Sequence, residues 1–387
     1  MLAYSGGLDT SVILKWLQEK YDSEVISYTA DIGQKIDRKK IFKSAKKFGV
    51  KKIIIENLKN LFVKEYIYPL IRSHAIYEGA YLLGTSIARP LIAKRQIAIA
   101  KKFNAYAVSH GSTGKGNDQV RFELGYHYFS PNIKVIAPWR IWKLNSRTDL
   151  INYAKKNSIT VPKDKKGAAP FSVDDNLFHT STEGKILENP KNQAPEFIFQ
   201  RTVSPEKAPN KISYVSIGFK NGDPITINGK KLSPENLLKK LNILAGKNGI
   251  GRVDIVENRF IGIKSRGVYE TPGGTLLMVA HRAIESVTLD KDTVHRKDEI
   301  MPKYAKLIYN GYWYSKARFK LQKIVDLKRN KVNGFVKLKL YKGNIIIISR
   351  QTKSNAYSMK KVSFEENKTF NKSNVERFIN FHKKNLR

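Results

Sequence analysis

The sequence predicts an α/β protein with two main parts, a first domain built on a parallel sheet and a second, α+β domain. Over residues 1–160, short β-rich runs alternate with amphipathic stretches, which is the pattern of βαβ units. Beyond residue 213 the pattern changes to hairpin-like strands with a helix between them. The chain has 387 residues, 41% of them hydrophobic, which is enough for two or three domains with buried cores.

In the first part, strands and helices are expected in turn. Strands are expected over residues 2–4, 24–29, 52–56, 106–109 and 134–137. Helices are expected over residues 10–20, 38–48, 59–74, 91–103 and 147–156. Pro90 would stand at the start of the helix over 91–103, and proline suits the first turn because the N–H that it lacks has no helical partner there.

Between Pro162 and Pro209 the periodicity fades into Pro, Asn, Ser and Lys, which indicates a connecting segment or an active-site loop region. In the second part, strands are expected over residues 214–219, 224–227, 336–341 and 345–349, and a helix over 234–245. The last ~40 residues are polar and rich in Lys, too thin to form a core alone. We therefore expect domains over 1–160 and 161–350, followed by a C-terminal tail over 351–387.

Cysteine is absent, which excludes disulfides, thiolate metal sites, iron–sulfur clusters and cysteine nucleophiles. The seven histidines include no pair at i,i+4 spacing, so the sequence gives no support to a histidine-built metal site, and each is expected to be structural or exposed. They are His74, His110, His127, His179, His281, His295 and His382. The chemistry must therefore rest on oxygen and nitrogen groups.

The formal net charge is +38, from 71 Lys and Arg against 33 Asp and Glu. A charge of this size invites a nucleic-acid interpretation, but the lysines are spread from Lys15 to Lys384 and favour solvated faces instead. The start of the chain lacks the pattern of a signal peptide, and no apolar run approaches the ~18 residues of a membrane span. We expect a soluble cytoplasmic protein without nucleic-acid or membrane partners.

The strongest local motif is Ser5-Gly6-Gly7-Leu8-Asp9-Thr10-Ser11, between a predicted strand and a predicted helix. Its glycines allow close approach of the backbone to an anion, its hydroxyls donate hydrogen bonds, and the helix start adds N–H groups and positive dipole. An ordinary Gly-rich turn is the alternative, but the density of hydroxyls favours a phosphate-binding loop. It is not a Walker A loop, and no complete G-x-G-x-x-G is present.

A second stretch, from His110 to Arg121, packs hydroxyl, amide, carboxylate and cationic groups into what is expected to be one loop. Arg121 can bind a carboxylate through two hydrogen bonds, and Asp118 can hold an ammonium. Glu257 and Tyr269 lie twelve residues apart in a stretch rich in glycine and charge. Taken alone, each would more often be an ordinary surface or interface residue.

The Ser5–Ser11 motif resembles the pyrophosphate-binding motif of the N-type ATP pyrophosphatases. Within that superfamily, an ordered series of further stretches over almost the whole chain is similar to the argininosuccinate synthase family. These stretches are residues 28–34 (YTADIGQ), 81–90 (YLLGTSIARP), 109–123 (SHGSTGKGNDQVRFE), 136–140 (IAPWR), 251–260 (GRVDIVENRF) and 264–272 (KSRGVYETP).

The resemblance implies an ATP pyrophosphatase-type nucleotide-binding domain followed by a synthetase and multimerisation domain. It also implies a ligase of arginine biosynthesis, in which the ureido oxygen of citrulline attacks the α-phosphorus of MgATP. The products of this step are a citrullyl-adenylate and pyrophosphate, and the aspartate amine then displaces AMP to give argininosuccinate. Such phosphoryl-transfer chemistry needs mostly positioning and charge neutralisation. ATP with Mg2+ enters as substrate, no tightly bound cofactor or protein metal site is implied, and the tail over 351–387 would dock on a neighbouring subunit of a homotetramer.

The family's site positions carry over residue by residue, and none of them is an evident proton-transfer acid or base. The ATP positions match Ala3, Tyr4, Ser5, Gly6, Gly7, Leu8, Asp9, Thr10, Ser11, Ala30 and Gly111. The citrulline positions match Tyr81, Ser86, Asn117, Arg121, Ser172, Ser181, Glu257 and Tyr269, with Arg121 facing the carboxylate and Glu257 the amino group. The aspartate positions match Thr113, Asn117 and Asp118.

Three features depart from the family pattern. The first strand, expected to be central in the sheet, is unusually short. Thr182 stands where an aromatic residue is usual, although the serines around it remain. The charge of +38 is higher than the family leads us to expect.

Two other functions remain open at this point. A transfer-RNA-modifying adenylase of the same superfamily would suit the basic charge, but thiolating members use cysteine and lysidine-forming members are not expected to carry the Thr113–Arg121 stretch. A non-enzymatic nucleic-acid-binding protein predicts clustered cations with interleaved aromatic residues, whereas these cations are dispersed.

Overall fold

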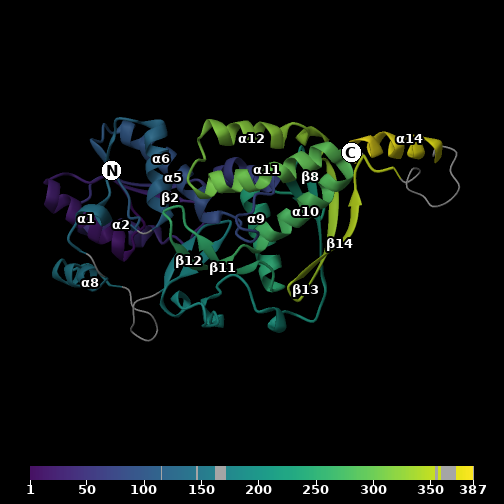
Figure 1. Cartoon of the computed structure of the whole chain (residues 1–387). Coiled ribbons are helices and arrows are strands. Elements are labelled where there is room, and N and C mark those ends of the chain that lie inside the picture. Colours follow the sequence, from purple (N-terminus) through teal and green to yellow (C-terminus); the bar gives the residue numbers. More distant parts are fainter. Residues whose placement is uncertain (115, 145–146, 162–170, 354–355, 359–371, 387) are drawn as a thin grey trace.

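The structure is a computed structural model of the chain, and it describes residues 1–114, 116–144, 147–161, 171–353, 356–358 and 372–386. The first part of the chain lies at one end of the molecule, and the helices and sheets of the second part lie beside it (Figure 1). Lys115 and residues 162–170, which belong to the motif and to the connecting segment discussed above, lie outside the described residues.

The first part is built on a five-stranded parallel sheet in the order β3-β2-β1-β4-β5, which confirms the predicted α/β class. The strands are β1 (Leu2–Ala3), β2 (Ser27–Asp31), β3 (Ile53–Asn57), β4 (Ala107–Ser109) and β5 (Lys134–Ile136). The two-residue β1 is central, as expected. Main-chain bonds hold it on both sides, because Leu2 N donates to the Ile26 carbonyl and Ser109 N donates to the Met1 carbonyl.

Helices cover both faces of this sheet. They are α1 (Leu8–Tyr21), α2 (Arg38–Lys47), α5 (Gly84–Lys102), α6 (Asn117–Phe129), the short α7 (Pro138–Ile141) and α8 (Arg147–Lys156). Val12 and Leu14 of α1 share one core with Leu150 of α8. Ala93 of α5 and Phe122 of α6 share another. The alternating pattern of the sequence therefore placed these layers correctly.

The stretch predicted as one helix over 59–74 is helical throughout but not uniform. It consists of α3 (Lys59–Phe62), the π-helical segment η1 (Val63–Ile67) and α4 (Tyr68–Ser73). The wider π turn immediately precedes Pro69, whose missing N–H would interrupt a regular α-helical ladder at this point.

Two helix boundaries were predicted wrongly. Helix α5 begins at Gly84 and not at residue 91, so Pro90 lies inside it, within its second turn. The expected loop His110–Arg121 ends at Gly116, because α6 begins at Asn117. The chemical groups of residues 117–121 therefore project from the first turns of a helix, where successive residues have fixed directions.

The second part contains two antiparallel sheets. One has the order β11-β12-β7-β6, from β6 (Ser172–Asp175), β7 (Thr180–Glu183), β11 (Arg252–Asn258) and β12 (Lys264–Glu270). The other has the order β10-β9-β8-β13-β14, from β8 (Ser213–Lys220), β9 (Asp223–Ile227), β10 (Lys230–Lys231), β13 (Gly334–Tyr341) and β14 (Asn344–Gln351). The expected hairpin between residues 336 and 349 is confirmed. The described end of the connecting segment, in contrast, carries the strands β6 and β7.

Helices α9 (Pro234–Lys247), α10 (Pro272–Thr288), α11 (Lys291–Tyr309) and α12 (Lys316–Asp326) complete the second part. The largest core crosses the boundary at residue 160, since it joins Tyr28 and Ile87 of the first part to Ile217 and Leu276 of the second. The domain limits 1–160, 161–350 and 351–387 stay predictions.

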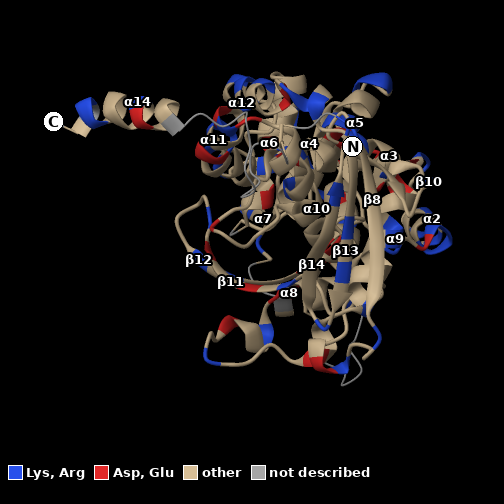
Figure 2. Cartoon of the chain, turned by 90° about the vertical axis from the view of Figure 1, so that its right-hand side faces the viewer, with Lys and Arg blue, Asp and Glu red and all other residues tan. Residues whose placement is uncertain are grey.

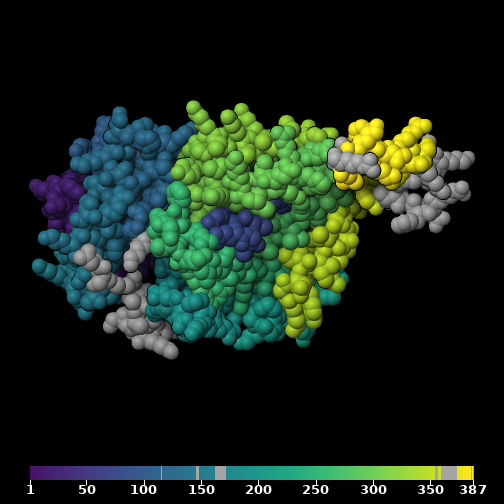
Figure 3. All heavy atoms as spheres, viewed as in Figure 1, coloured from purple at the N-terminus to yellow at the C-terminus, as the bar shows by residue number. Residues whose placement is uncertain are grey.

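Helix α14 (Lys372–Lys383) projects from one end of the molecule in Figures 1 and 3. Three of its apolar side chains, Phe378, Ile379 and Phe381, are exposed. Lys and Arg are dispersed over many helices and strands and do not gather in one stripe (Figure 2). No helix among the described residues combines the length and the apolar character needed to cross a membrane.

Candidate active site

The carboxyl ends of the parallel strands carry the loops that contain the predicted nucleotide residues. Tyr4 and Ser5 follow β1, Ala30 lies near the end of β2, and Gly111 follows β4. In open parallel sheets, ligands bind at this edge, beside the point where the strand order reverses. A Cβ on Gly111 would lie 3.0 Å from Thr10 Cγ2, so the second loop rests directly on the first.

The Ser5–Ser11 loop has the geometry of an anion site. Gly6 adopts φ +74°, which favours glycine, and lets the chain turn sharply into α1. The Ser5 and Thr10 hydroxyls lie 3.0 Å apart, and Ser5 Oγ accepts a hydrogen bond from Gly7 N at 3.2 Å. Gly7 is the N-cap of α1 and brings no side-chain cap, so the N–H groups of the first helical turn remain available to an anion.

The residues predicted to bind the substrate aspartate lie at the N-terminal end of α6 and in the loop before it. Gly116 N donates to the Thr113 carbonyl at 3.1 Å, which places Thr113 beside Asn117 at the start of the helix. Asn117 Oδ1 accepts from Phe260 N at 3.0 Å, in the turn between β11 and β12. Asn117 thus contacts the hairpin that carries Glu257.

Asp118 lies between two arginines. Arg89 Nε donates to Asp118 Oδ2 at 2.8 Å, and Arg121 Nη1 donates to Oδ1 at 2.9 Å. Burial works against ionisation of this carboxyl, but the two guanidinium groups outweigh it and hold its pKa below the usual range. Arg89 also donates to Asp174 Oδ1 at 2.6 Å. Asp118 is therefore a half-buried, ionised carboxylate, a type of group that can bind an ammonium.

The guanidinium of Arg121 is held by a main-chain atom of a residue that is distant in the sequence. Its Nε and Nη2 donate to the main-chain carbonyl of Tyr309, at 3.0 and 2.8 Å. With Nη1 engaged by Asp118, only part of the guanidinium edge remains for a substrate carboxylate.

Glu257 and Tyr269 meet across the β11–β12 hairpin. Tyr269 donates to Glu257 Oε1 at 2.9 Å, and Glu257 Oε2 has no hydrogen-bond partner among the described residues. Burial raises the pKa of the Glu257 carboxyl, against the opposing effects of the Tyr269 hydrogen bond and the Arg121 charge. A buried carboxylate with a free oxygen is a receptor for a cationic group such as an ammonium.

Aromatic rings line this part of the site. Tyr81 stacks on Tyr269 with centroids 4.3 Å apart, and its hydroxyl accepts from Thr85 N at 3.1 Å. The Ser86 hydroxyl, one residue further along α5, is buried and has no partner among the described residues. Of the residues predicted to bind citrulline, Tyr81, Tyr269 and Glu257 are thus joined by a ring stack and a hydrogen bond, and Ser86 and Glu257 each carry a buried polar atom without a partner among the described residues.

The two remaining serines lie on neighbouring strands. Ser181 of β7 is the register partner of Tyr269. Ser172 lies exposed on the edge strand β6, where it pairs with Glu183. Thr182, the residue that departs from the family pattern, is buried and points to the opposite face of β7 from Ser181, because alternate residues of a strand face opposite ways. The departure therefore leaves the serine face unchanged.

The sequence analysis missed three residues that contact the predicted site residues. Arg89 lies within the quoted stretch 81–90, but nothing indicated its role as a bridge between Asp118 and Asp174. His179 is fully buried, accepts or donates at 2.8 Å with Thr85 Oγ1, and stacks near Tyr269. Tyr309 contributes a main-chain atom, for which no sequence signal exists.

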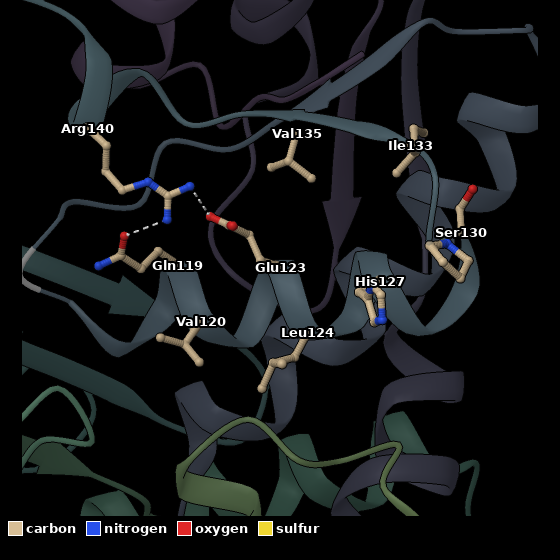
Figure 4. A pocket seen from close by; sticks show the side chains of 10 residues that line it. Gln119, Val120, Glu123, Leu124, His127, Ser130, Ile133, Val135 and Arg140 are labelled. Carbon is tan, nitrogen blue, oxygen red and sulfur yellow. Dashed lines mark hydrogen bonds and ion pairs between the residues drawn. The ribbon is translucent and has the colours of Figure 1, made fainter.

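A cavity of about 420 Å³ opens on a face of α6 other than the one that carries Asp118 and Arg121, so it is separate from the candidate active site. Gln119, Glu123 and His127, spaced at i,i+4, line it, and Arg140 reaches across to Glu123 and Gln119 (Figure 4). Asp118 and Arg121 are not among its lining residues.

One cluster among the described residues has the spacing of a metal site, namely His74, His281 and Glu285. His74 Nε2 lies 2.9 Å from Glu285 Oε2 and 3.0 Å from His281 Nδ1. The buried ammonium of Lys297 already contacts Glu285, so a cation fills the position that a metal would neutralise. The cluster is therefore a buried charge network that joins α10 and α11.

Comparison with known proteins decides the family. The family model described as arginosuccinate synthase N-terminal HUP domain matches residues 1–160, and the one described as arginosuccinate synthase C-terminal domain matches residues 171–387. The chain belongs to the argininosuccinate synthase family. It is 85% identical to the argininosuccinate synthase of Pelagibacter ubique over 100% of this chain and 98% of that protein. It is 60% identical to that of Parvibaculum lavamentivorans over 95% of this chain and 89% of that protein.

Among solved structures, the U34-tRNA thiolase NcsA from Methanococcus maripaludis matches at 15% identity with a TM-score of 0.27, over 44% of this chain and 60% of that one. A similarity of this size carries no argument about function. The resemblance to the argininosuccinate synthase family drawn from the sequence is confirmed over nearly the full chain.

Proposed function

We propose that this chain catalyses the reaction of its family, the ATP-dependent ligation of citrulline and aspartate to argininosuccinate, with release of AMP and pyrophosphate. The observation that supports the proposal is a series of contacts that links three kinds of group, through Gly111 beside Thr10 and through Asn117 bonded to Phe260. The three kinds of group are the anion loop at the start of α1, the Asp118–Arg121 turn of α6, and the buried carboxylate of Glu257. Together they complement a triphosphate and two amino-acid head groups.

ATP would lie at the carboxyl edge of the sheet, with its pyrophosphate held by the Ser5–Ser11 loop and its base beside Ala30. The loop supplies hydroxyls and the N–H groups at the start of α1, which stabilise negative charge as the bond between the α and β phosphates breaks. Mg2+ would arrive with ATP and neutralise part of the phosphate charge. These assignments extend to Ala3, Tyr4, Leu8, Asp9 and Gly111.

Citrulline would bind through its head group. Arg121 would donate to the carboxylate, and Glu257 Oε2, which is buried without a partner among the described residues, would accept from the α-ammonium. Tyr81, Ser86, Asn117, Ser172, Ser181 and Tyr269 complete the proposed subsite. The ureido oxygen of the bound citrulline attacks the α-phosphorus of ATP, and the citrullyl-adenylate forms as pyrophosphate leaves.

Aspartate would bind at Thr113, Asn117 and Asp118, with its ammonium on the Asp118 carboxylate. The amine must lose a proton before it displaces AMP, and no side chain is assigned as the base. Catalysis would therefore come mainly from alignment of the two amino acids and neutralisation of phosphate charge.

We also propose that the enzyme is a cytoplasmic homotetramer, with the tail over 351–387 docked on a neighbouring subunit. The exposed apolar side chains of α14 support this, because exposed apolar groups that lie together favour contact with another protein surface. Removal of residues 352–387 should reduce the number of subunits in each particle, which light scattering measures through the particle mass. A truncated protein that remains a tetramer would contradict the role of the tail.

The test of the function is a product assay with substrate omission. We expect AMP, pyrophosphate and argininosuccinate in equal amounts when MgATP, citrulline and aspartate are all present, and no argininosuccinate when one amino acid is omitted. An enzyme that is folded and binds ATP but forms no argininosuccinate would contradict the proposal. Adenylation of transfer RNA by the same preparation would favour the RNA-modifying alternative instead.

A further inference from the structure

Helix α11 ends against the proposed citrulline site, although it belongs to a distant part of the chain. Its last turn closes with two main-chain bonds, from Gly311 N to the Ile308 carbonyl at 3.0 Å and from Tyr312 N to the Leu307 carbonyl at 2.9 Å. This is the Schellman arrangement, and Gly311 takes the left-handed conformation that it requires, with φ +90°. The arrangement leaves the carbonyl of Tyr309 free to accept from outside the helix.

Arg121 uses that free carbonyl. Its Nε and Nη2 both donate to it, and its guanidinium lies 5.1 Å from the centre of the Tyr309 ring. The C-terminal end of a helix carries partial negative charge, which stabilises a guanidinium there. Arg121 is thus fixed along one edge by α11, and one N–H on each of Nη1 and Nη2 remains beyond the bonds to Tyr309 and Asp118.

The Tyr309 side chain reaches the other half of the head-group site. It is 1% exposed and stacks on Tyr77 with ring centroids 3.7 Å apart and an interplanar angle of 4°. Its hydroxyl is buried without a hydrogen-bond partner among the described residues, and it opposes the rise that burial causes in the pKa of the Glu257 carboxyl. Tyr77 in turn donates to the carbonyl of Asn258, the residue after Glu257, at 2.7 Å.

We propose that the C-terminal end of α11, through the carbonyl and the hydroxyl of Tyr309, positions Arg121 and Glu257 for the head group of the citrulline substrate. Tyr309 is a positioning residue in this account, since it acts through the two groups that hold the carboxylate and the ammonium. Its hydroxyl would act on the Glu257 carboxylate and not on the substrate. The inference rests on the proposed function, because it concerns the amino acid that is adenylated.

The proposal separates into two parts that two variants can test. Tyr309→Phe keeps the ring stack and the carbonyl and removes only the hydroxyl. Gly311→Ala acts on the carbonyl, because a Cβ at this position would be strained by its positive φ and would lie 3.1 Å from Arg121 Cα and 3.2 Å from Arg121 Cγ. It must push the end of α11 away from Arg121.

Two control variants match these changes. Tyr128→Phe removes a hydroxyl from an exposed tyrosine on the outer side of α6. Gly229→Ala places a Cβ at a glycine of φ +76°, in the turn between β9 and β10, where no atom lies within 4 Å of it. Both controls should retain the kinetic constants of the wild-type enzyme.

The experiment measures kcat and the KM of each substrate in the argininosuccinate-forming assay, together with the Tm of each variant. We expect Tyr309→Phe to raise the KM for citrulline about tenfold, with kcat and the KM for ATP and aspartate within about twofold of wild type. Gly311→Ala should raise the KM for citrulline by more, because Arg121 loses two hydrogen bonds. If Gly311→Ala fails to fold, Tyr309→Phe alone decides.

An unchanged KM for citrulline in Tyr309→Phe would overturn the proposal. So would a loss of kcat with no selective effect on citrulline, since that result indicates a merely structural role. If the wild-type enzyme forms argininosuccinate and only the variant results disagree, the proposed function stands and this inference fails. If the wild-type enzyme forms none, both fail.

Discussion

The guanidinium of Arg121 is held by the main-chain carbonyl of Tyr309, a residue 188 positions later in the chain. The proposed citrulline site is therefore assembled from both parts of the protein, with Arg121 on α6 of the first part and Glu257, Tyr269 and Tyr309 in the second. Neither part alone presents a complete receptor for an amino-acid head group.

Gly6→Ala should impair the use of ATP selectively. The position has φ +74°, and a Cβ there would lie 2.9 Å from Ile41 Cγ1, so the loop must shift away from its anion-binding shape. We expect the KM for ATP to rise at least tenfold with little change in the KM for citrulline. Gly49→Ala is a matched control, because it has φ +72° and no atom within 4 Å. Equal effects of the two substitutions on the KM for ATP would contradict the assignment of the loop.

Asp118→Asn should weaken aspartate binding. The change removes the charge that would hold the aspartate ammonium, and it leaves the buried guanidinium groups of Arg89 and Arg121 with one carboxylate fewer. We expect the KM for aspartate to rise by one to two orders of magnitude, about 1.4 to 3 kcal/mol. Initial-rate kinetics with aspartate as the varied substrate measure this. An enzyme with unchanged dependence on aspartate would show that the ammonium binds elsewhere.

Glu257→Gln should alter the pH dependence of both the activity and the stability of the protein. The raised pKa of this carboxyl means that wild-type kcat/KM for citrulline should fall with decreasing pH before an ordinary carboxylate is protonated, and the variant should lose this dependence along with most of its affinity. The folded state of the wild-type protein also retains a proton that the unfolded state has lost, in the window above the usual carboxyl pKa. Its stability therefore decreases as the pH rises through that window.

The same substitution should consequently raise the Tm by a few degrees at pH 7.5, because it removes the cost of a buried charge. Calorimetry at pH 5 and pH 7.5 checks the sign. A lower Tm at pH 7.5 in the variant would mean that the carboxylate is stabilised in the folded protein and not penalised by burial.

Glu285→Gln should destabilise the protein without a direct effect on substrate binding. His281, His74 and Lys297 hold the pKa of the Glu285 carboxyl far below its usual range despite its burial. A carboxyl with a lowered pKa adds stability above its unfolded pKa, and that stability is lost as the pH falls below it. Removing the charge leaves Lys297 buried without its carboxylate and should cost about 3–5 kcal/mol.

Denaturant unfolding at pH 7.5 measures the cost in Glu285→Gln. Asp298→Asn is the control, since its ion pair with Arg282 is exposed and should contribute about 0–1 kcal/mol. A loss of stability no larger than that of the control would contradict the account of the buried network.

The sequence predicted those parts of the molecule whose signals are local. The alternation of strands and helices gave the parallel sheet and its layers. The Gly and Ser pattern gave the anion loop, because a positive φ at Gly6 and an uncapped helix start are properties of a few adjacent residues.

The wrongly predicted helix boundaries lie where contacts with residues distant in the sequence affect the local structure. Gly84, the first residue of α5, packs against the ring of His179, 95 residues away, so closely that a Cβ would lie 2.3 Å from His179 Cγ. No periodicity before Pro90 reveals this contact. The early start of α6 was hidden by Gly114 and Gly116, which suggested a longer loop.

The candidate site was found mainly through the ordered resemblance of motifs. Glu257 and Tyr269 carried no independent signal, since their meaning depends on the register of β11 and β12. The role of Arg89 follows from the packing of α5 against α6 and β6. The anchoring of Arg121 by a main-chain carbonyl cannot be seen in any residue type.

The most direct test of the account is the fate of the ureido oxygen of citrulline. With citrulline labelled with ¹⁸O at that position, MgATP and aspartate, we expect mass spectrometry to find the label in AMP, because the oxygen that attacks the α-phosphorus leaves with it. AMP without the label, or its formation at the same rate without citrulline, would contradict a citrullyl-adenylate and with it the proposed function of this site.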